Sequence, residues 1–390
     1  MNELLQKVSL GSEAAFPKQE FDGRIAALQA VLTEKNVDLF LTSGPENIFY
    51  LTGQQTPGYY TFQCLCVPAV GSPFLMTREL ESYNARANTY LEESFSYPDG
   101  ADPAAAVAAI LKEQGWSGKR IAIDRNAWFF TVNLYERLKQ DFGTFRDGSG
   151  LVEPLRRIKS PLELEAMSLA GKANDAGMRA GLAMTKAGAS ENDIASAIMG
   201  AAIAAGSEYV GMEPFVTSGP RSGIPHSTWR RRKIEPGDIV ILETSACYNR
   251  YHAALFRTVA VGDVPALARS RYETCMAALA AAIEKVRPGN TCADVHHATQ
   301  AIVDRDGATD GYRKRTGYSM GISFAPDWGE GNILSLYKGV DVELRPGMVF
   351  HIPITLREYA QFTVAVSETV AVTENGCKTL SDIPRDLVEA

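Results

Sequence analysis

Hydrophobic and polar positions in the first 150 residues follow two alternating spacings. Apolar residues recur at helical spacing over 20–35, which predicts a helix, and the apolar run 37–42 predicts a strand ending at the break Ser43-Gly44-Pro45. The same patterns predict these further elements: paired strands at 63–67 and 73–76 around Gly71-Ser72, helices near 79–93, 102–114 and 130–140, and a strand at 120–124. Strand–helix alternation of this kind is typical of an α/β layer.

A glycine-rich segment at 148–150 separates this pattern from a more helical one. Ser160 is a suitable N-cap, Pro161 fits the first helical turn and Glu163 completes a capping box, so a long helix is expected to begin here. The other helices expected are 191–205, 264–286 and 293–306, with strands in the remaining segments. Helices on one side of a largely antiparallel sheet make an α+β domain. We therefore predict two domains, an α/β domain over 1–155 and an α+β domain over 160–390.

Composition narrows the class of protein. The chain has 390 residues, 45% of them hydrophobic and 22% charged, which is ordinary for a globular protein. Its net charge of −7 argues against a nucleic-acid surface. No signal peptide and no run of about 18 apolar residues is present, so no membrane partner is expected. The six cysteines lack zinc-site spacing, and we interpret them as reduced thiols in a cytoplasmic protein.

Four segments in the second half match a known pattern. Residues 243–258 read ETSACYNRYHAALFRT, 316–325 read TGYSMGISFA, 346–354 read PGMVFHIPI and 368–376 read ETVAVTENG. They resemble the metal-binding segments of the creatinase/prolidase-like peptidases, family M24. The resemblance implies a pita-bread catalytic domain, a creatinase-type N-terminal domain and a homodimer.

The residues at the family's ligand positions differ from those that hold metal. The resemblance places Glu243, Ala254, Tyr318, Pro353 and Ser367 at these positions. Alanine and proline side chains cannot ligate, and one or two carboxylates are too few for a metal pair. We therefore predict a site that uses no metal and no cofactor.

The segment 222–226, SGIPH, retains the family's substrate-binding histidine at His226. Three further segments are similar to bacterial ectoine hydrolases: PHSTW (225–229), CYNRYH (247–252, which includes Tyr248) and PDWGE (326–330). Creatinase, a metal-free member of the same family, uses the corresponding histidine as an acid/base. An imidazole can give or take a proton near neutral pH, so we predict this role for His226.

Glu243 is the second predicted catalytic residue. It can attack an electrophilic carbon and form a covalent intermediate, or it can activate water as a general base. The structural alternative is a carboxylate that pairs with Arg257 or another nearby cation. The sequence does not separate these three roles.

Strand parity supplies further candidates, because alternate residues of a strand share a face. His252 shares parity with Ala254, and His351 with Pro353, so both histidines are expected to face the pocket. Strict register turns Glu368 away, but a β-bulge would bring it in as a catalytic carboxylate. For each histidine the alternative is an ordinary buried core residue.

The remaining candidates are substrate contacts. The Tyr318 hydroxyl can donate to the substrate, and Trp328 with Glu330 can order the pocket wall. Arg257, or one of Arg230–Arg232, can hold a carboxylate. An aromatic loop supplies Tyr59, Tyr60 and Phe62, which by the resemblance close over the partner's pocket; packing on their own domain is the alternative.

A pocket without metal lacks a Lewis acid, so it suits a substrate with an activated carbon. Amidines and guanidines qualify because they carry their own cation, and an anionic pocket would attract them. We predict a small-molecule hydrolase that opens a cyclic amidine, similar to ectoine hydrolase. The alternatives are a creatinase-type reaction on a guanidino acid, an Xaa-Pro metallopeptidase with unusual ligands, and a non-catalytic binding protein.

Overall fold

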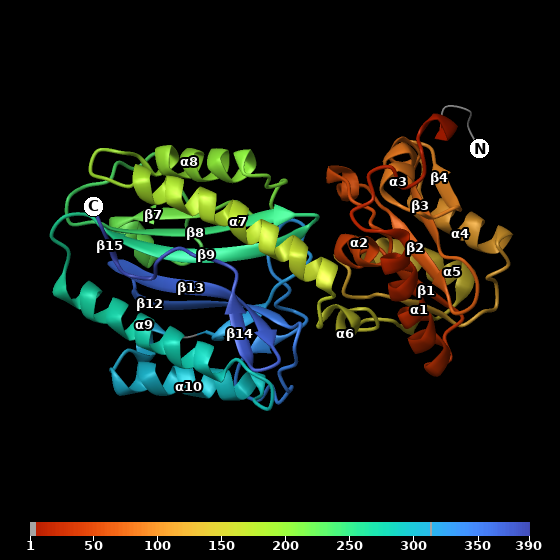
Figure 1. The fold of residues 1–390 in the computed structure, drawn as a ribbon. Helices are drawn as coiled ribbons and strands as arrows, with labels where there is room; N and C mark the ends of the chain where they lie inside the picture. The colour runs from red at the N-terminus through yellow and green to blue at the C-terminus, as the bar shows by residue number, and fades with distance from the viewer. Residues whose placement is uncertain (1–4, 313) are drawn as a thin grey trace. The chain divides into compact units, whose positions relative to one another are not determined.

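The computed structural model describes residues 5–312 and 314–390, and the chain divides into two compact units after Arg156 (Figure 1). The N-terminal unit is built on a six-stranded sheet in the order β4-β3-β2-β1-β5-β6, in which β2 pairs antiparallel with both neighbours and the other pairs are parallel. The strands are β1 (Leu39–Thr42), β2 (Cys64–Pro68), β3 (Phe74–Arg78), β4 (Ser94–Tyr97), β5 (Ile121–Ile123) and β6 (Arg146–Asp147). The helices are α1 (Lys18–Glu34), α2 (Pro45–Thr52), α3 (Ser82–Asn88), α4 (Pro103–Glu113), α5 (Val132–Phe142) and α6 (Glu153–Arg156).

Helix α2 was not predicted, because Ser43-Gly44-Pro45 was interpreted as a break. Gly44 is instead the N-cap and Pro45 occupies the first helical turn, where a proline loses no hydrogen bond. The helix expected near 79–93 is shorter, since a 3-10 turn (Glu79–Glu81) precedes α3. The first difference arises because a Gly-Pro pair can either end a strand or begin a helix.

The C-terminal unit contains two sheets with helices on their outer faces (Figure 1). The first sheet consists of β15 (Val388–Glu389), β9 (Tyr251–Ala260), β8 (Ile239–Tyr248) and β7 (Phe215–Ser218), in that order. The second consists of β11 (Ser335–Leu336), β10 (Gly317–Ser319), β12 (Val349–Glu358), β13 (Phe362–Thr373) and β14 (Gly376–Thr379). The helices are α7 (Pro161–Met184) and α8 (Glu191–Ala204) beside the first sheet, and α9 (Ala266–Lys285) and α10 (Cys292–Arg305) beside the second. The predicted α+β class is confirmed.

Helix α7 begins as the sequence predicts. The Ser160 hydroxyl accepts a hydrogen bond from the backbone N of Glu163 at 3.3 Å, and the Glu163 carboxylate accepts one from the backbone N of Ser160 at 2.8 Å. The helix is held on the outer face of β8 by Asn174, whose amide oxygen accepts from the Thr244 hydroxyl at 2.6 Å. Even-numbered residues of β8 therefore face α7, and odd-numbered ones face the second sheet.

The inner faces of the two sheets are joined along β9 and β13 by threonine hydroxyls. Thr369 Oγ1 donates to the carbonyl of Ala254 at 2.8 Å and accepts from its N–H at 3.1 Å. Thr258 Oγ1 makes the same pair of contacts with Ala365, both at 2.8 Å. We call these contacts the β9–β13 seam. Its geometry places odd-numbered residues of β12 and β13 on the inner face.

Within the described residues, no helix is both long and apolar enough to span a membrane. The six cysteines are free thiols, and burial raises the pKa of Cys247 well above its usual value. Such thiols are poor nucleophiles and behave as small core residues.

Candidate active site

Glu243 lies on the inner face of β8, between Phe215 on β7 and Phe256 on β9. Its side chain is partly exposed and makes no hydrogen bond to the described part of the chain. Burial raises the pKa of this carboxyl to about 7, although the cations of Lys314 and Arg357 oppose the rise. Near neutral pH it can therefore exist with or without its proton.

Lys314 and Arg357 bring positive charge to this carboxylate from the second sheet. Lys314 precedes β10, and its ammonium donates to the carbonyl of Pro353 at 2.9 Å and lies 3.4 Å from Thr355 Oγ1. Burial, with the repulsion of Arg357, lowers its pKa to about 8, although Glu243 works against this. Burial also lowers the pKa of Arg357, which shares the inner face of β12 with Pro353 and Thr355.

The sequence motifs do not indicate Lys314 or Arg357 as site residues. Parity with Pro353 along β12 would have placed Arg357 on the inner face, by the reasoning applied to His351. For Lys314 no strand pattern exists, because it lies in the loop before β10. The expectation of an anionic pocket is therefore wrong, since two cations accompany Glu243.

A chain of hydrogen bonds connects Tyr318, His351 and Ser367. His351 Nδ1 lies 2.9 Å from the Tyr318 hydroxyl, and Nε2 lies 2.7 Å from Ser367 Oγ. Ser367 Oγ also accepts from the backbone N of Phe256 at 2.7 Å, and the Tyr318 hydroxyl accepts from Trp328 Nε1 at 2.9 Å. We call the three linked side chains the Tyr318–His351–Ser367 relay.

One tautomer of His351 leaves the phenolic proton of Tyr318 for a ligand. Burial lowers the pKa of His351 well below its usual value, so the imidazole is neutral and has one donor and one acceptor nitrogen. If Ser367 donates to Nε2, then Nδ1–H donates to Tyr318 and the phenolic proton is left for a ligand. Burial also raises the pKa of Tyr318 well above its usual value, which keeps this proton in place. Both ring nitrogens of His351 are taken up by Tyr318 and Ser367, so this histidine lies on the inner face as expected but supports the pocket without a nitrogen left for a substrate.

His226 and two aromatic side chains lie beside Glu243. The Trp328 ring packs edge-on against Phe215 at a centroid distance of 5.4 Å, and the His226 imidazole lies 6.0 Å from Phe215. Because Phe215 pairs with Glu243 across β7 and β8, His226 lies on the same side of the site. His226 is exposed and has a φ of +55°, a backbone conformation that few residues adopt.

The segment before His226 is attached to the second sheet. The backbone N of Thr363 donates to Ser222 Oγ at 3.1 Å, and the backbone N of Ala360 donates to the carbonyl of Gly223 at 3.3 Å. A Cβ added at Gly223 would lie 2.8–2.9 Å from backbone atoms of the β12–β13 turn, so only glycine fits. The position of His226 therefore depends on this turn.

Two family models match this chain. Residues 165–374 match "Metallopeptidase family M24", and residues 24–158 match the "Creatinase/Prolidase N-terminal domain". The chain belongs to metallopeptidase family M24. The predicted family and the pita-bread fold with a creatinase-type N-terminal domain are thus confirmed.

Relatives within M24 have different activities. The chain is 29% identical to an ectoine hydrolase from Halomonas elongata, over 95% of this chain and 98% of the relative. It is 26% identical to an Xaa-Pro dipeptidase from Lactobacillus helveticus, over 92% and 97%. Among solved structures, a prolidase from Thermococcus sibiricus superposes with a TM-score of 0.85 at 26% identity, over 95% and 99%. The M24 hydrolase class is established by these matches, whereas the bond that is cleaved differs among the relatives.

The five residues that the resemblance places at M24 ligand positions do not fit a metal pair. Glu243 is their single carboxylate, Ala254 and Pro353 have no donor atom in the side chain, and Tyr318 and Ser367 are engaged in the relay. No cluster of three or more His, Cys, Asp or Glu side chains in residues 5–312 and 314–390 is arranged to hold a metal ion. A pair of divalent cations needs several such ligands.

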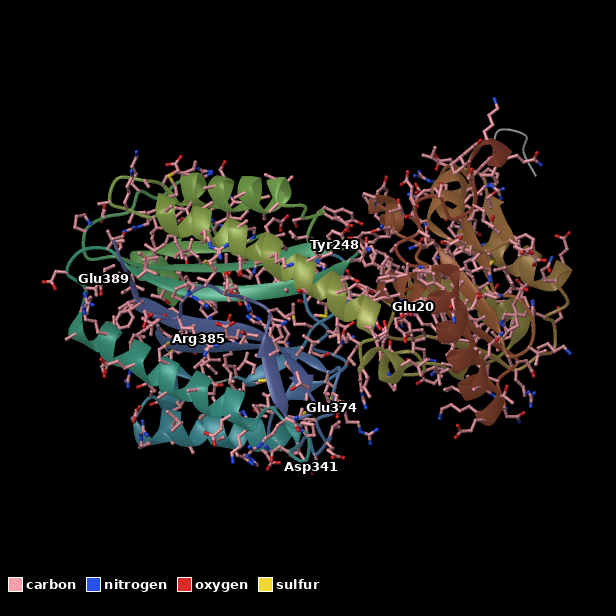
Figure 2. All side chains as sticks on the ribbon, in the orientation of Figure 1. Glu20, Tyr248, Asp341, Glu374, Arg385 and Glu389 are labelled. Atoms are coloured by element: carbon pink, nitrogen blue, oxygen red, sulfur yellow. The ribbon has the colours of Figure 1, made fainter. Side chains whose placement is uncertain are left out.

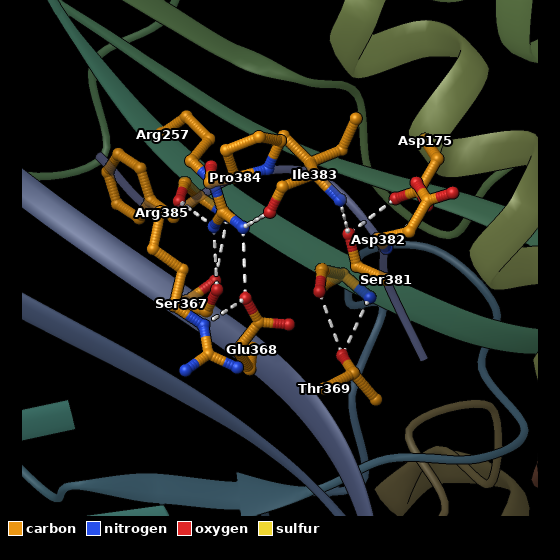
Figure 3. Close-up of polar contacts among 12 residues, drawn as sticks. Asp175, Arg257, Ser367, Glu368, Thr369, Ser381, Asp382, Ile383, Pro384 and Arg385 are labelled. Carbon is orange, nitrogen blue, oxygen red and sulfur yellow. Dashed lines mark hydrogen bonds and ion pairs between the residues drawn. The ribbon is translucent and has the colours of Figure 1, made fainter. Parts of the chain in front are cut away.

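Glu368 and Arg257 do not reach the M24 pocket (Figure 3). The β12–β13 ladder runs without a bulge and pairs Glu368 with Ile352, so its carboxylate points away from the inner face. It accepts hydrogen bonds from Arg257 and Arg385, each at 2.9 Å. Arg257 uses all five of its N–H groups, four of them on backbone carbonyls, so none is left for a substrate carboxylate. Both predicted roles are corrected.

His252 has no nitrogen available for proton transfer. Its Nε2 accepts from the backbone N of Gly211 at 3.0 Å, and its Nδ1 lies 3.0 Å from the carbonyl of Arg250. Burial lowers the pKa of this fully buried imidazole well below its usual value. The core alternative therefore replaces the catalytic one.

Glu330 and Tyr248 are also placed outside the pocket. Glu330 is buried and accepts from Lys159 Nζ at 2.8 Å and from the backbone N of Ile322 at 3.1 Å, which anchors the Trp328 loop. Tyr248 stands at the hairpin end of β8 and shares parity with Thr244, on the face that α7 covers (Figure 2). The hydrogen bonds of Glu330 decide its case, and the strand parity of Tyr248 decides the other.

The aromatic loop belongs to the N-terminal unit. Tyr59 packs edge-on against Phe129 at 5.4 Å, and Phe62 against Phe130 at 6.0 Å. Tyr60 is 72% exposed. Packing on the loop's own domain thus describes Tyr59 and Phe62, and the role of Tyr60 over a partner's pocket stays a prediction.

Proposed function

We propose that this chain is a metal-independent hydrolase that opens a non-peptide C–N bond of a small zwitterionic amidine, as an ectoine hydrolase does. The observation that carries the proposal is Glu243, a partly exposed carboxylate without a hydrogen-bond partner among the described residues. It stands at a position that resembles an M24 ligand position, where Ala254 and Pro353 have no donor atom in the side chain and the other two companions are hydrogen-bonded to His351. The Halomonas elongata relative supports the substrate class.

An amidine suits this pocket because its carbon is already activated by the delocalised cation. Addition of one water to a cyclic amidine breaks one ring C–N bond and leaves an amide at one nitrogen and an amine at the other. Glu243 either attacks the carbon and is released by water, or removes a proton from the attacking water. Both versions need the carboxylate ionised.

His226 is proposed to donate the proton that the departing nitrogen requires. It lies beside Phe215 on the side of the site where Glu243 is placed, and its exposure gives it exchange with solvent. Trp328 and the phenolic proton of Tyr318 would orient the ligand. General acid catalysis of this kind contributes about 10²–10⁴-fold to the rate.

An Xaa-Pro metallopeptidase is the second candidate, because dipeptidases and prolidases are among the relatives. It requires ligands beyond the five M24 positions. A creatinase-type reaction on a guanidino acid would use the same residues as the primary proposal. A homodimer in the cytoplasm remains the expected state of the protein.

The test is turnover of ectoine, hydroxyectoine, creatine and an Xaa-Pro dipeptide by purified protein, with metal content measured on the same sample. Ring opening of ectoine by protein with less than about one metal per chain, lost in Glu243→Gln but kept in the exposed control Glu374→Gln, is the expected result. Dipeptide cleavage by protein with two bound metals would overturn the proposal. Cleavage of creatine alone would retain the chemistry and change the substrate.

A further inference from the structure

Arg357 has an incompletely paired guanidinium beside the site. Its side chain makes no hydrogen bond or ion pair within the described residues, and its Nε is buried without a partner. Nearly all buried polar groups in proteins are hydrogen-bonded, so such a group indicates a role. Because Arg357 shares the inner face with Pro353 and Thr355, this role belongs to the pocket.

Two threonine hydroxyls without partners lie on the same inner surfaces. Thr363 pairs with Arg357 across β12 and β13, and Thr217 on β7 shares parity with Phe215. Both side chains are fully buried, and neither Oγ1 has a hydrogen-bond partner in the described part of the protein. Together with Arg357 they present hydrogen-bond donors from both sheets.

The charges near Glu243 are unequal. Lys314 and Arg357 both act on this carboxylate, and the other anion near it, Asp327, is exposed and accepts hydrogen bonds from Trp328 and Gly329. Two cations and one carboxylate in a poorly solvated space leave one positive charge without a buried counter-ion among the residues that the structure describes, which is costly. An anionic ligand group would supply that counter-ion.

We propose that Arg357, with Lys314 and the hydroxyls of Thr363 and Thr217, binds the carboxylate of the substrate, while Glu243 meets its cationic carbon. This inference rests on the proposed function and deepens it. The substrate class is then a small amidine acid, with both charges on one molecule. An amidine without a carboxylate, or a neutral amide, would lack half of the contacts.

Three other arginines, Arg257, Arg232 and Arg315, already donate hydrogen bonds within the chain. Arg257 has used all its donors. Arg232 donates to the Asp238 carboxylate at 3.0 Å and to Ser218 Oγ at 2.9 Å. Arg315 donates to the carbonyl of Gly331 at 3.1 Å and to Ser335 Oγ at 3.0 Å. The sequence predicted the carboxylate subsite at Arg257 or one of Arg230–Arg232, of which Arg230 and Arg231 are exposed to solvent. We assign the subsite to Arg357, which lies on the inner face.

The experiment compares two substrates that differ only by the carboxylate: ectoine and 2-methyl-1,4,5,6-tetrahydropyrimidine. For Arg357→Met, kcat/KM for ectoine should fall roughly 10- to 100-fold, as expected for a lost charged hydrogen bond. The value for the decarboxylated amidine should fall clearly less than that for ectoine, because this substrate loses only the effect of the Arg357 cation on the ionisation of Glu243. Arg305→Met, an exposed arginine paired with its neighbour Asp306, is the control for both substrates.

Thr363→Val is a second test, which is needed in case Arg357→Met does not fold. Removing a buried hydroxyl that has no partner should leave thermal stability unchanged or slightly raised. A selective rise in KM for ectoine, with kcat and Tm unchanged, would therefore assign the hydroxyl to the ligand. An equal loss on both substrates in Arg357→Met and no effect of Thr363→Val would overturn the subsite and leave the proposed function intact.

A binding measurement separates the two proposals if neither amidine is turned over. Calorimetric titration with ectoine and with the decarboxylated amidine does not depend on the reaction. Ectoine binding that is lost in Arg357→Met, without turnover, would refute the proposed function and keep the subsite. Equal binding of both compounds to wild type and variant would refute the subsite as well.

Discussion

Nε2 of His351 lies 2.7 Å from the hydroxyl of Ser367, across the β12–β13 pair. Ser367 stands at an M24 ligand position, and its hydroxyl is directed to a neutral imidazole and to the backbone of Phe256. The Ser367 side chain, which resembles a metal ligand in position, thus forms hydrogen bonds within the protein. The relay stabilises the pocket through neutral contacts, whose strength depends little on salt.

Replacing His351 with Phe should destabilise the protein by about 2–4 kcal/mol, because the buried hydroxyls of Tyr318 and Ser367 each lose a partner. Gln at this position keeps a donor and an acceptor and should cost less. Urea unfolding of the two variants measures the difference. Equal stability of wild type and His351→Phe would show that the relay has no structural role.

Glu368→Gln should cost about 3 kcal/mol or more, because the cation of fully buried Arg257 loses its counter-charge. Ectoine turnover by the fraction that stays folded should change little, since Glu368 points away from the site. Guanidinium unfolding and activity per folded molecule are the two readouts. A stable but inactive variant would return Glu368 to the list of catalytic residues.

The activity should rise with pH through about 7, as Glu243 loses its proton, and fall above about 8 if the charge of Lys314 is required. The measurement is kcat/KM for ectoine from about pH 5 to about pH 10. Lys314→Met should move the acidic limb to higher pH, because the Lys314 cation opposes the rise in the pKa of Glu243. A loss of activity at high pH that comes from His226 as the proton donor should remain in this variant. A flat profile would contradict the assignment of Glu243.

Stability should depend on the same carboxyl in the opposite sense. Its pKa is raised on folding, so the stability it contributes is present below its unfolded value of 4.5 and is lost as pH rises through about 7. The free energy of unfolding of Glu243→Gln should therefore exceed that of wild type by on the order of 1–3 kcal/mol at pH 8. At pH 5 the two proteins should have about the same stability, and urea unfolding at both pH values measures the difference. A destabilised Glu243→Gln at pH 8 would indicate that the carboxylate is a structural partner of Lys314 or Arg357.

His226→Asn tests the proton donor with the backbone preserved, because Asn tolerates a positive φ. The expected loss in kcat for ectoine is about 10²–10⁴-fold, with KM changed much less. His297→Asn, on the surface of α10, is the matched control and should keep the wild-type kcat. Wild-type kcat in His226→Asn would exclude the histidine as the acid.

Sequence patterns located most of the helices and strands, and they showed which residues stand where related peptidases have metal ligands. Both can be read from short segments of the chain. Helix α7 is an example, since its capping residues Ser160 and Glu163 specify its start. Strict strand parity was also informative: it placed Glu368 on the outer side, and only the added bulge was wrong.

Other features could not be predicted because they depend on which partners meet in space. His252 has the parity of a pocket residue, but the backbone of Gly211 and Arg250 takes both nitrogens. Arg257 looked like a substrate anchor until the C-terminal segment supplied its acceptors. Lys314 lies in a loop, where no periodicity indicates the direction of a side chain.

The β12–β13 turn has a consequence for how this site can change. It contacts the Ser222–Gly223 segment that leads to His226, and it begins after Glu358, the residue that follows Arg357 in β12. The positions of His226, proposed to protonate the leaving nitrogen, and Arg357, proposed to bind the carboxylate, therefore both depend on this turn. An insertion or deletion in this turn would shift both at once, so new substrates should be reached more readily by side-chain exchange on the sheets than by remodelling this loop.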